Sequence, residues 1–582
     1  MRTHFLTFLL LLCFILPVKS QPKHEIRATW LTTLGGMDWP RQKATNAEGI
    51  RKQQQELCDI LDRLKEAHFN TVLFQTRLRG DLIYPSNIET FPEALTGRTG
   101  RNPGYDPLAF VIEECHKRGM ELHAWIVTIP VGNTRQVRLL GKHSVVSKNR
   151  KICKQFKGSW YLDPGHPETA DYLSRIVREI ATNYDVDGIH FDYIRYPEQG
   201  TRFPDNDTYR KYGKKKNKVQ WRRENITSLV RRLYTDIKSI KPWIKVSSSP
   251  VGKFASTSRY SSKGWDAYHA VHQDAQGWLK EGIHDALFPM MYFQGNDFYP
   301  FVLDWKENDN GRWVVPGLGI YFLSPKEKDW PLEEIARQIN FTREEGLGGQ
   351  AYFRNRFLLD NVKGIYDEVK DGFYTTSALL PPMSWIDSIA PSAPTARIYE
   401  AQADGRVRLA WEASKDNHDL PVVYHLYASS TYPVDTNDAQ NLHTTYLKGT
   451  ETTVKEGYYY AVTSTDRYGN ESAPLALNEP SDICIPILNK GNTLVIPSIQ
   501  NITNICICTP AGEEIMQIPP KTQADIHSLK SGIYFVYIID ASYNRTLVGT
   551  ILKHYCIFRS KNKAINKIMC TFAYSIEKQY HS

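Results

Sequence analysis

The sequence predicts an α/β fold, a (β/α)8 TIM-like barrel, followed by two all-β sandwich domains. From Glu25 to about residue 375, short apolar runs alternate with long amphipathic stretches, which is typical of strand-helix repeats around a parallel sheet. Beyond that region the pattern changes to short alternating strands separated by turn residues, which is typical of β-sandwiches. The chain has 582 residues, and domains usually hold about 100 to 200, so several domains are expected.

Eight strands with intervening helices are predicted in the first part of the chain, and this number indicates a closed barrel. The predicted strands are 26–32, 71–75, 121–128, 188–192, 244–249, 286–292, 314–320 and 349–353. The predicted helices, which carry apolar residues at three- and four-residue spacing, are 49–67, 107–118, 167–184, 222–240, 265–281 and 332–345. An open doubly wound sheet is the alternative, but no G-x-G-x-x-G follows the first strand, which disfavours its dinucleotide-binding version.

The domain organisation after the barrel follows from composition. The barrel is expected over 24–377, and the Pro- and Ser-rich stretch 378–395 is predicted to be a linker. Residues 396–478 contain short strands and the lone Trp411, and they resemble a fibronectin type III domain. Residues 482–553 are expected to form a C-terminal β-sandwich module, and the basic tail 554–582 fits neither domain.

The first twenty residues predict a signal peptide. A short basic start is followed by an apolar stretch, and the segment ends in the small residue Ser20. A lipoprotein anchor at Cys13 is disfavoured, because Leu12 stands where such anchors need a small residue. We therefore expect export to the periplasm, the cell surface or the medium. No later apolar stretch reaches the about 20 residues that a spanning helix needs, so we expect no integral membrane segment after cleavage.

The charge and the aromatic content of the chain indicate which class of molecule it binds. The net charge of +9 owes much to the runs 214–216 and 553–578, so a spread-out surface for nucleic acid is not supported. Aromatic residues make up 12% of the chain, and aromatic side chains suit ligands with flat faces such as sugar rings. We expect a polysaccharide partner and no nucleic acid.

Asp192 is the first candidate for a catalytic residue. It ends the apolar strand 188–192, and in barrels of this kind catalytic groups lie at the carboxyl ends of the strands. The structural alternative is that Asp192 only pairs with Arg195 or Arg77 to organise the loop. Glycoside cleavage needs a second carboxyl group. The candidates for it are Asp81, Asp163, Glu198 and Glu224.

Other side chains at the strand ends are candidates for substrate binding. Aromatic residues there can stack on sugars or can cap the barrel core, and several together favour ligand contact. The predicted substrate-binding residues are Arg77, Trp125, Arg195, Tyr196, Tyr292 and Tyr352.

A metal site has little support in the sequence. His190 and Asp192 are two apart on a strand and face the same way, but no second set of ligands accompanies them. His190 and His123 are therefore interpreted as hydrogen-bonded histidines of the barrel interior. Cys506-Ile507-Cys508 is a lone C-x-C motif without a second cluster. We predict no metal and no other cofactor.

The barrel resembles the glycosyl-hydrolase-like family 10 of secreted bacterial proteins. The resemblance covers about residues 24 to 375, and the strings that carry it include 25–30, 75–81, 104–108, 122–125, 184–193 and 277–282. It implies hydrolysis of a glycosidic bond, with peptidoglycan glycan strands as a substrate class. Carried over by position, the site would include Arg77, Asp81, Trp125, Asp192 and Arg195. Asp163 stands where relatives often have Asn, and Tyr193 where many have Asp.

The sequence thus predicts an exported glycoside hydrolase that works with two carboxyl groups. Two alternatives remain open. The barrel could bind a glycan without cleaving it, which the absence of a second acid within about 10 Å of Asp192 would favour. The protein could also be a metal-dependent deacetylase or amidase, which sensitivity to a chelator would reveal.

Overall fold

The computed structural model describes most of the chain. The described residues are 21–197, 202–213, 215–402, 404–479, 488–490, 493–495, 502–519, 523–530, 532–540 and 545–553. The predicted signal peptide, the basic tail and Glu198 lie outside them. In the described part, no helix combines the length and the apolar character that crossing a membrane requires.

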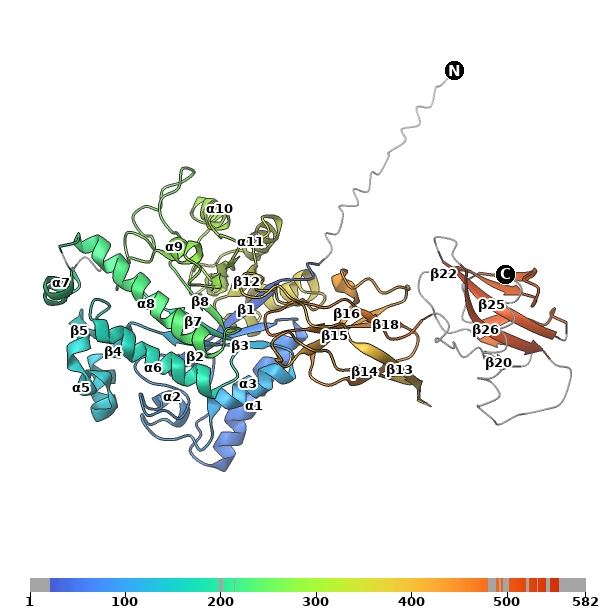
Figure 1. Ribbon diagram of the computed structural model, residues 1–582, viewed down its shortest axis with the longest axis horizontal. Coiled ribbons are helices and arrows are strands. Elements are labelled where there is room, and N and C mark those ends of the chain that lie inside the picture. Colours follow the sequence, from blue (N-terminus) through green and yellow to red (C-terminus); the bar gives the residue numbers. More distant parts are fainter. Residues whose placement is uncertain are drawn as a thin grey trace, which may run out of the picture.

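A curled parallel sheet forms the first domain (Figure 1). Its strand order is β10-β9-β8-β7-β3-β2-β1-β12-β11. The strands are β1 (Ile26–Leu31), β2 (Thr71–Arg77), β3 (Glu121–Val127), β7 (Gly188–Asp192), β8 (Lys245–Ser248), β9 (Ala286–Leu287), β10 (Trp313–Val314), β11 (Gly317–Leu318) and β12 (Gly349–Tyr352). Each of the eight predicted strands is therefore present, although several are shorter than predicted.

The two edges of this sheet meet in one stretch of chain. β10 pairs with β9, and β11 pairs with β12, yet only Val315 and Pro316 separate β10 from β11. The Gly317 N–H donates to the Pro289 carbonyl at 2.8 Å, and the Phe353 N–H donates to the Leu318 carbonyl at 3.0 Å. The sheet therefore closes on itself, as predicted. The predicted strand 314–320 is interrupted because proline has no N–H to donate.

Long helices follow most strands and cover the outside of the sheet (Figure 1). They are α1 (Ala47–Glu66), α3 (Pro107–Lys117), α6 (Pro167–Asn183), α8 (Lys218–Ile240) and α11 (Leu332–Glu344). Five of the six predicted helices match these bounds closely. The sixth, 265–281, is confined to α9 (Ala275–Lys280). It starts late because the Asp274 side chain caps the Gly277 N–H and so marks the helix start.

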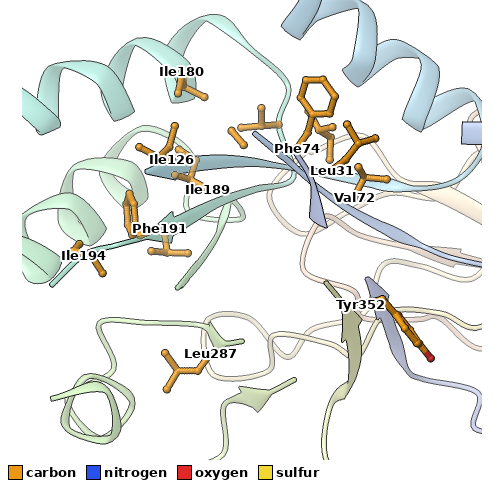
Figure 2. Packing of buried hydrophobic residues seen from close by; sticks show 14 of the residues in the cluster. Leu31, Val72, Phe74, Ile126, Ile180, Ile189, Phe191, Ile194, Leu287 and Tyr352 are labelled. Carbon is orange, nitrogen blue, oxygen red and sulfur yellow. The ribbon is translucent and has the colours of Figure 1, made fainter. Parts of the chain in front are cut away.

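Apolar side chains fill the space between the sheet and these helices (Figure 2). Successive strand residues point to opposite faces, so Val72 and Phe74 of β2, and Ile189 and Phe191 of β7, point toward the helices. Ile180 of α6 lies on the helix side of Ile189, and it is also fully buried. This layer fixes the strands, and with them the positions of the side chains at the strand ends.

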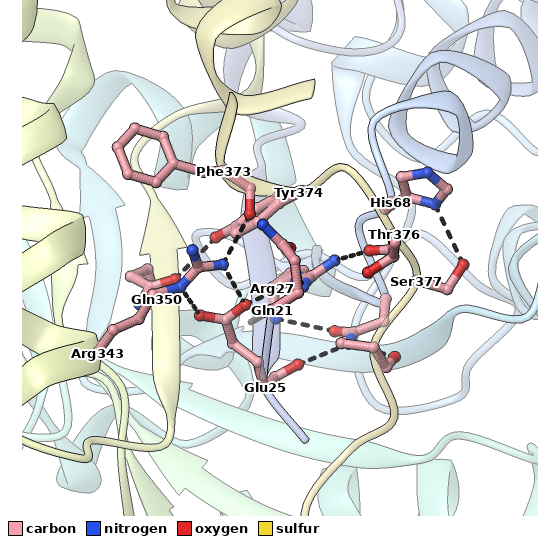
Figure 3. Close-up of polar contacts among 12 residues, drawn as sticks. Gln21, Glu25, Arg27, His68, Arg343, Gln350, Phe373, Tyr374, Thr376 and Ser377 are labelled. Carbon is pink, nitrogen blue, oxygen red and sulfur yellow. Dashed lines mark hydrogen bonds and ion pairs between the residues drawn. The ribbon is translucent and has the colours of Figure 1, made fainter. Parts of the chain in front are cut away.

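The amino-terminal segment is tied to the end of the barrel by charged groups (Figure 3). Glu25 accepts hydrogen bonds from Arg27 at 2.8 Å and from Arg343 of α11 at 2.7 Å. The Arg27 guanidinium also lies over the Tyr374 ring at 4.2 Å. Removal of Glu25 would leave the buried Arg27 guanidinium without its anion, so this cluster holds the first strand in place.

The predicted linker packs against the barrel. Leu380 and Met383 are buried in one cluster with Trp30 and Trp313, and Tyr468 of the following domain joins them. The Trp385 indole donates to the Asp285 carboxylate at 3.0 Å, and Arg467 pairs with Asp185 at 2.8 Å. The barrel and the next domain therefore share an apolar core across the predicted linker.

Two antiparallel sheets form that next domain. One has the order β13-β14-β17 and the other β16-β15-β18-β19. The strands are β13 (Thr395–Ala401), β14 (Arg406–Glu412), β15 (Val423–Ser429), β16 (Leu442–Leu447), β17 (Glu451–Lys455), β18 (Tyr459–Thr465) and β19 (Leu475–Ala476). The buried Trp411 and Tyr424 pack together at 5.3 Å between ring centroids.

Two further antiparallel sheets form the C-terminal module, β20-β21-β24 and β23-β22-β25-β26. The strands are β20 (Leu488–Lys490), β21 (Thr493–Val495), β22 (Ile502–Cys508), β23 (Glu514–Ile518), β24 (Gln523–Asp525), β25 (Gly532–Asp540) and β26 (Arg545–Lys553). All-β domains therefore follow the barrel, as predicted.

Candidate active site

A cavity of about 700 Å³ opens at the carboxyl ends of the barrel strands. Its lining comes from the loops after several strands and from an insertion after β3 that sequence reasoning missed. The insertion forms a small sheet, β4 (Pro130–Asn133), β6 (Ser159–Leu162) and β5 (Cys153–Phe156). The lining includes Arg79, Trp125, Trp160, Tyr161, Asp192, Tyr193, Tyr292, Tyr321, Glu327, Phe353 and Arg354.

Asp192 is a buried residue of this cavity's lining, and its side chain is held by three donors. The Trp125 indole donates to Oδ2 at 3.1 Å. Oδ1 accepts from the Tyr193 N–H at 2.7 Å and from the Ser249 hydroxyl at 3.0 Å. Trp125 and Asp192 come from neighbouring strands, and Ser249 directly follows the next strand, β8. The carboxyl is thus fixed by the barrel itself.

The environment of Asp192 shifts its acidity. Burial raises the pKa of the Asp192 carboxyl above its ordinary value, while the Arg195 charge and the three donors oppose that rise. A buried carboxyl with a raised pKa is suited to hold a proton that it can transfer. Arg195, a predicted substrate-binding residue, does not line the cavity. It is buried, and its guanidinium lies over the Tyr193 ring at 4.6 Å.

Aromatic rings form one wall of the cavity. Tyr292 stacks on Phe353 with ring centroids 5.2 Å apart, and Tyr321 meets Tyr292 edge-on at 5.7 Å. Burial, followed by the Asp192 charge, raises the pKa of Tyr292 well above its ordinary value. Its hydroxyl therefore stays protonated and can donate a hydrogen bond. Such a wall offers apolar faces beside a polar group, which ligand sites commonly combine.

Glu327 is a second carboxylate in the lining, and sequence reasoning missed it. It follows the short helix η6 (Ile320–Leu323), and its side chain is exposed. Burial, followed by the Glu327 charge, raises the pKa of Tyr321 to about 12. The Glu327 carboxylate is therefore close enough to Tyr321 of the aromatic wall to affect it electrostatically. The signal that could have found Glu327 is its place in the loop after the seventh strand.

Arg354 and Asp38 form a charged pair at the edge of the cavity. Arg354 lines the cavity, and its Nη1 lies 3.6 Å from Asp38 Oδ1. Asp38 also accepts hydrogen bonds from the Thr32 N–H at 2.9 Å and the Arg356 N–H at 3.2 Å. Burial raises the pKa of Asp38 to about 6. Asp38 thereby positions Arg354, and neither residue was singled out as a catalytic or binding residue from the sequence.

Asp81 lines a second cavity, next to the first. Its Oδ1 accepts the Arg79 N–H at 3.3 Å, and burial raises the pKa of its carboxyl to about 6. Arg79 lines both cavities. The structure therefore places Asp81 beside the Asp192 cavity and not within its lining.

Arg77 and Asp163 are held in buried networks instead. The Arg77 guanidinium forms two hydrogen bonds with Glu89, at 2.7 and 2.8 Å, and also donates to the carbonyl oxygens of Val127 and Thr128. Asp163 accepts from the Thr208 hydroxyl at 2.5 Å and caps the turn at Gly165. Both side chains are fully buried, and neither lines the cavity.

Three further candidates also lie outside the lining. Tyr196 is buried against Phe203 and His272, and Tyr352 packs between sheet and helices, where its hydroxyl meets that of Tyr374 at 2.9 Å. Glu224 lies on α8 and pairs with Lys216 on the outer surface. Of the predicted site residues, Asp192, Trp125 and Tyr292 are therefore brought together.

His190 is a hydrogen-bonded residue of the barrel interior. Its Nε2 accepts the Trp30 indole N–H at 3.2 Å, and its Nδ1 meets the Ser247 hydroxyl at 2.9 Å. Burial holds the pKa of His190 well below its ordinary value, so the ring is neutral. In the described part of the chain, no three His, Cys, Asp or Glu side chains are grouped as a metal site would require.

Comparison with known proteins places the chain in a family. The family model described as glycosyl hydrolase-like 10 matches residues 25–316. The chain is 31% identical to glycosyl hydrolase YngK of Bacillus subtilis (strain 168), over 80% of this chain and 96% of YngK. It is 36% identical to glycosyl hydrolase DigH of Escherichia coli (strain K12), over 47% of this chain and 67% of DigH.

A solved structure is also similar to the chain. The PgaB (BpsB) glycoside hydrolase domain from Bordetella bronchiseptica aligns with a TM-score of 0.41 and 17% sequence identity. The alignment covers 60% of this chain and 98% of that domain.

Proposed function

Because the chain belongs to the glycosyl hydrolase-like 10 family, we propose that it is an exported hydrolase that cleaves O-glycosidic bonds in peptidoglycan glycan strands. One observation carries the proposal: the buried carboxyl of Asp192 faces a cavity that has an aromatic wall and a second carboxylate, Glu327. Glycoside hydrolysis uses two carboxyl groups on opposite sides of the scissile bond. The names of YngK and DigH point to the same bond class.

Asp192 is suited to the role of general acid. Oδ1 already accepts two hydrogen bonds, whereas Oδ2 accepts one, from Trp125. Oδ2 therefore keeps an unused position for a proton that is transferred to the glycosidic oxygen. Burial favours the protonated form, as is expected of a general acid in a glycosidase.

Glu327 is the candidate for the second carboxyl group. It would act as nucleophile or activate a water molecule, and its negative charge would stabilise the oxocarbenium-like transition state. Tyr292, whose hydroxyl stays protonated, could donate a hydrogen bond to the sugar in the same cavity. Asp81 and Asp163 are weaker candidates, because neither lines the cavity that holds Asp192.

The test is the release of reducing ends from peptide-free glycan strands. The Asp192→Asn variant should be slower than the wild type by about 100-fold or more, the usual contribution of a general acid. Asp171→Asn is a matched control, because its side chain is exposed on α6. It should keep wild-type activity. Circular dichroism would show that all three proteins fold alike.

Other outcomes would point to the alternative functions. If wild type and Asp192→Asn both bind the strands and neither releases reducing ends, the protein is a glycan-binding protein. If the wild type instead releases acetate or peptide, and a chelator abolishes that activity, it is a metal-dependent deacetylase or amidase.

Export is part of the proposal, and it rests on the first twenty residues of the sequence. Sequencing of the amino terminus of the protein from its native host would test it. A mature protein that starts near Gln21 is expected, whereas a retained Met1 would contradict export by this route.

A further inference from the structure

A second cavity continues the cleft beyond Asp192. Its volume is about 400 Å³, and both cavities fall within the range of about 300 to 1,000 Å³ typical of small-molecule sites. The two share three lining residues, Leu34, Leu78 and Arg79. These residues follow β1 and β2, so the combined cleft runs along one side of the barrel mouth.

The second cavity joins polar groups to an apolar surface. Asp81 and Lys43 line it, and the Lys43 ammonium donates to the Ala94 carbonyl at 2.7 Å. Leu139, on α4 (Thr134–Leu140), also lines it, and its side chain is 51% exposed. A sugar ring presents apolar C–H faces between hydroxyl groups, so it needs both kinds of contact. In this cavity, the exposed Leu139 can contact the C–H faces, and the polar groups beside it can contact the hydroxyl groups.

Arg79 stands where the two cavities meet. No hydrogen bond or ion pair of its guanidinium with another described residue is seen. A guanidinium offers five N–H donors in a fixed plane, which can bind two neighbouring oxygen atoms at once. Its position between the cavities would let it contact adjacent sugar units of one chain.

We propose that the second cavity binds further sugar units of the strand that is cleaved at Asp192. This inference rests on the proposed function and extends it: the enzyme would hold several consecutive sugars and attack bonds inside a chain. Contacts far from the reacting bond can be used to lower the barrier to its cleavage, so truncated substrates react more slowly. Longer strands would therefore be the better substrates.

The experiment compares peptide-free glycan strands of two lengths, a tetrasaccharide and an octasaccharide. The wild type should cleave the octasaccharide with a higher kcat/KM. Leu139→Glu places a charge in the second cavity, and it should lower kcat/KM by about tenfold for the octasaccharide and little for the tetrasaccharide, since unpaired charge opposes apolar contact. Arg138→Gln is the matched control, because Arg138 is exposed next to it, lies outside both linings, and changes the net charge equally.

Arg79→Ala is the second variant, in case Leu139→Glu does not fold. It should lower kcat/KM for the octasaccharide by about tenfold or more, as expected for a lost hydrogen bond to a charged group, and affect the tetrasaccharide less. Binding to Asp192→Asn, with and without each substitution, provides a readout that does not need turnover. Tighter binding of the octasaccharide is expected there, and Leu139→Glu should remove that advantage.

The outcomes separate the two proposals. Equal binding and equal kcat/KM for the two lengths would overturn the second subsite and leave the proposed hydrolysis standing. An equal effect of Leu139→Glu and of Arg138→Gln on the octasaccharide would also overturn it. If neither strand binds nor is cleaved, the proposed substrate class fails, and the subsite that rests on it fails with it.

Discussion

The indole N–H of Trp125 donates a hydrogen bond to Oδ2 of Asp192 at 3.1 Å. The two side chains come from β3 and β7, which lie side by side in the barrel. Because paired strands hold both partners, the contact does not depend on a mobile loop. Sites built on strands are held more precisely than sites on loops. The Trp125 N–H stabilises the ionised form of Asp192, so it should set the pH range in which the carboxyl carries a proton.

The Trp125→Phe substitution should therefore shift the pH profile of activity to higher pH. It keeps an aromatic ring and removes the donor, so the pKa of Asp192 should rise further above its ordinary value. The limb of the kcat/KM profile that reports Asp192 should move to higher pH.

Ser249→Ala is a companion variant, since it removes a donor to Oδ1. It should shift the profile in the same direction. A profile that both substitutions leave in place would mean that Asp192 does not titrate in the catalytic step.

The Glu327→Gln substitution tests the second carboxyl group. It should reduce kcat by about 100-fold or more if Glu327 acts as nucleophile or base. The side chain is exposed, so the free energy of unfolding should change by less than about 0.5 kcal/mol.

Glu333→Gln is the control, because Glu333 is exposed nearby on α11 and lines neither cavity. Full activity of Glu327→Gln, together with a large loss in Asp81→Asn, would assign the second role to Asp81. Analysis of the product anomer would then tell whether the enzyme retains or inverts configuration.

Much of the barrel could be predicted because its signals are local. Strand residues such as Val72 and Phe74 are apolar in sequence and buried in the structure, and the helices on the outside carry regular apolar spacing. The break at Pro316 could have been expected from the same rules. The docking of Met383 in the barrel core could not, because the Pro- and Ser-rich composition around it is that of a linker and its partners are distant in sequence.

The site was predictable only in part. Asp192 stands out because a carboxylate interrupts an apolar pattern. Glu327 does not, since it lies in a charged loop where acidic residues are ordinary. Arg77 follows the pattern of a site residue at a strand end, yet its side chain points to Glu89. Sequence position gives the end of a strand but not the direction in which a long side chain extends.

Asp38 should make stability depend on pH. Its pKa is about 6 in the folded protein, above the value of about 3.9 in an unfolded chain. A raised pKa means that folding favours the protonated form. The stabilisation is therefore complete below about pH 3.9 and is lost as pH rises through about 6.

Urea unfolding of wild type and Asp38→Asn at pH 4 and pH 7.5 would measure this effect. Between pH 4 and pH 7.5, the free energy of unfolding of the wild type should fall by up to about 3 kcal/mol relative to that of the variant. The reason is that one pKa unit corresponds to about 1.4 kcal/mol. The exposed Asp171→Asn variant should follow the wild type. Parallel pH dependence in Asp38→Asn and wild type would show that Asp38 does not titrate in this range.

Arg77 should act on stability rather than on substrate contact. Its guanidinium is fully buried, pairs with Glu89, and donates to the carbonyl oxygens at the end of β3. Arg77→Ala would leave the Glu89 carboxylate buried without its cation, although the Tyr172 hydroxyl at 2.6 Å would remain. Loss of one partner of a buried ion pair costs about 3 to 5 kcal/mol, which denaturant unfolding would measure.

The double variant Arg77→Met with Glu89→Leu separates the charge effect from the packing effect. An apolar pair of similar volume often replaces a buried ion pair at little cost, so the double variant should be more stable than Arg77→Ala alone. If Arg77→Ala instead unfolds like the wild type and only weakens the binding of glycan strands, Arg77 contacts the substrate, as its position at the end of β2 first indicated. The buried contacts with Glu89 argue for the structural role.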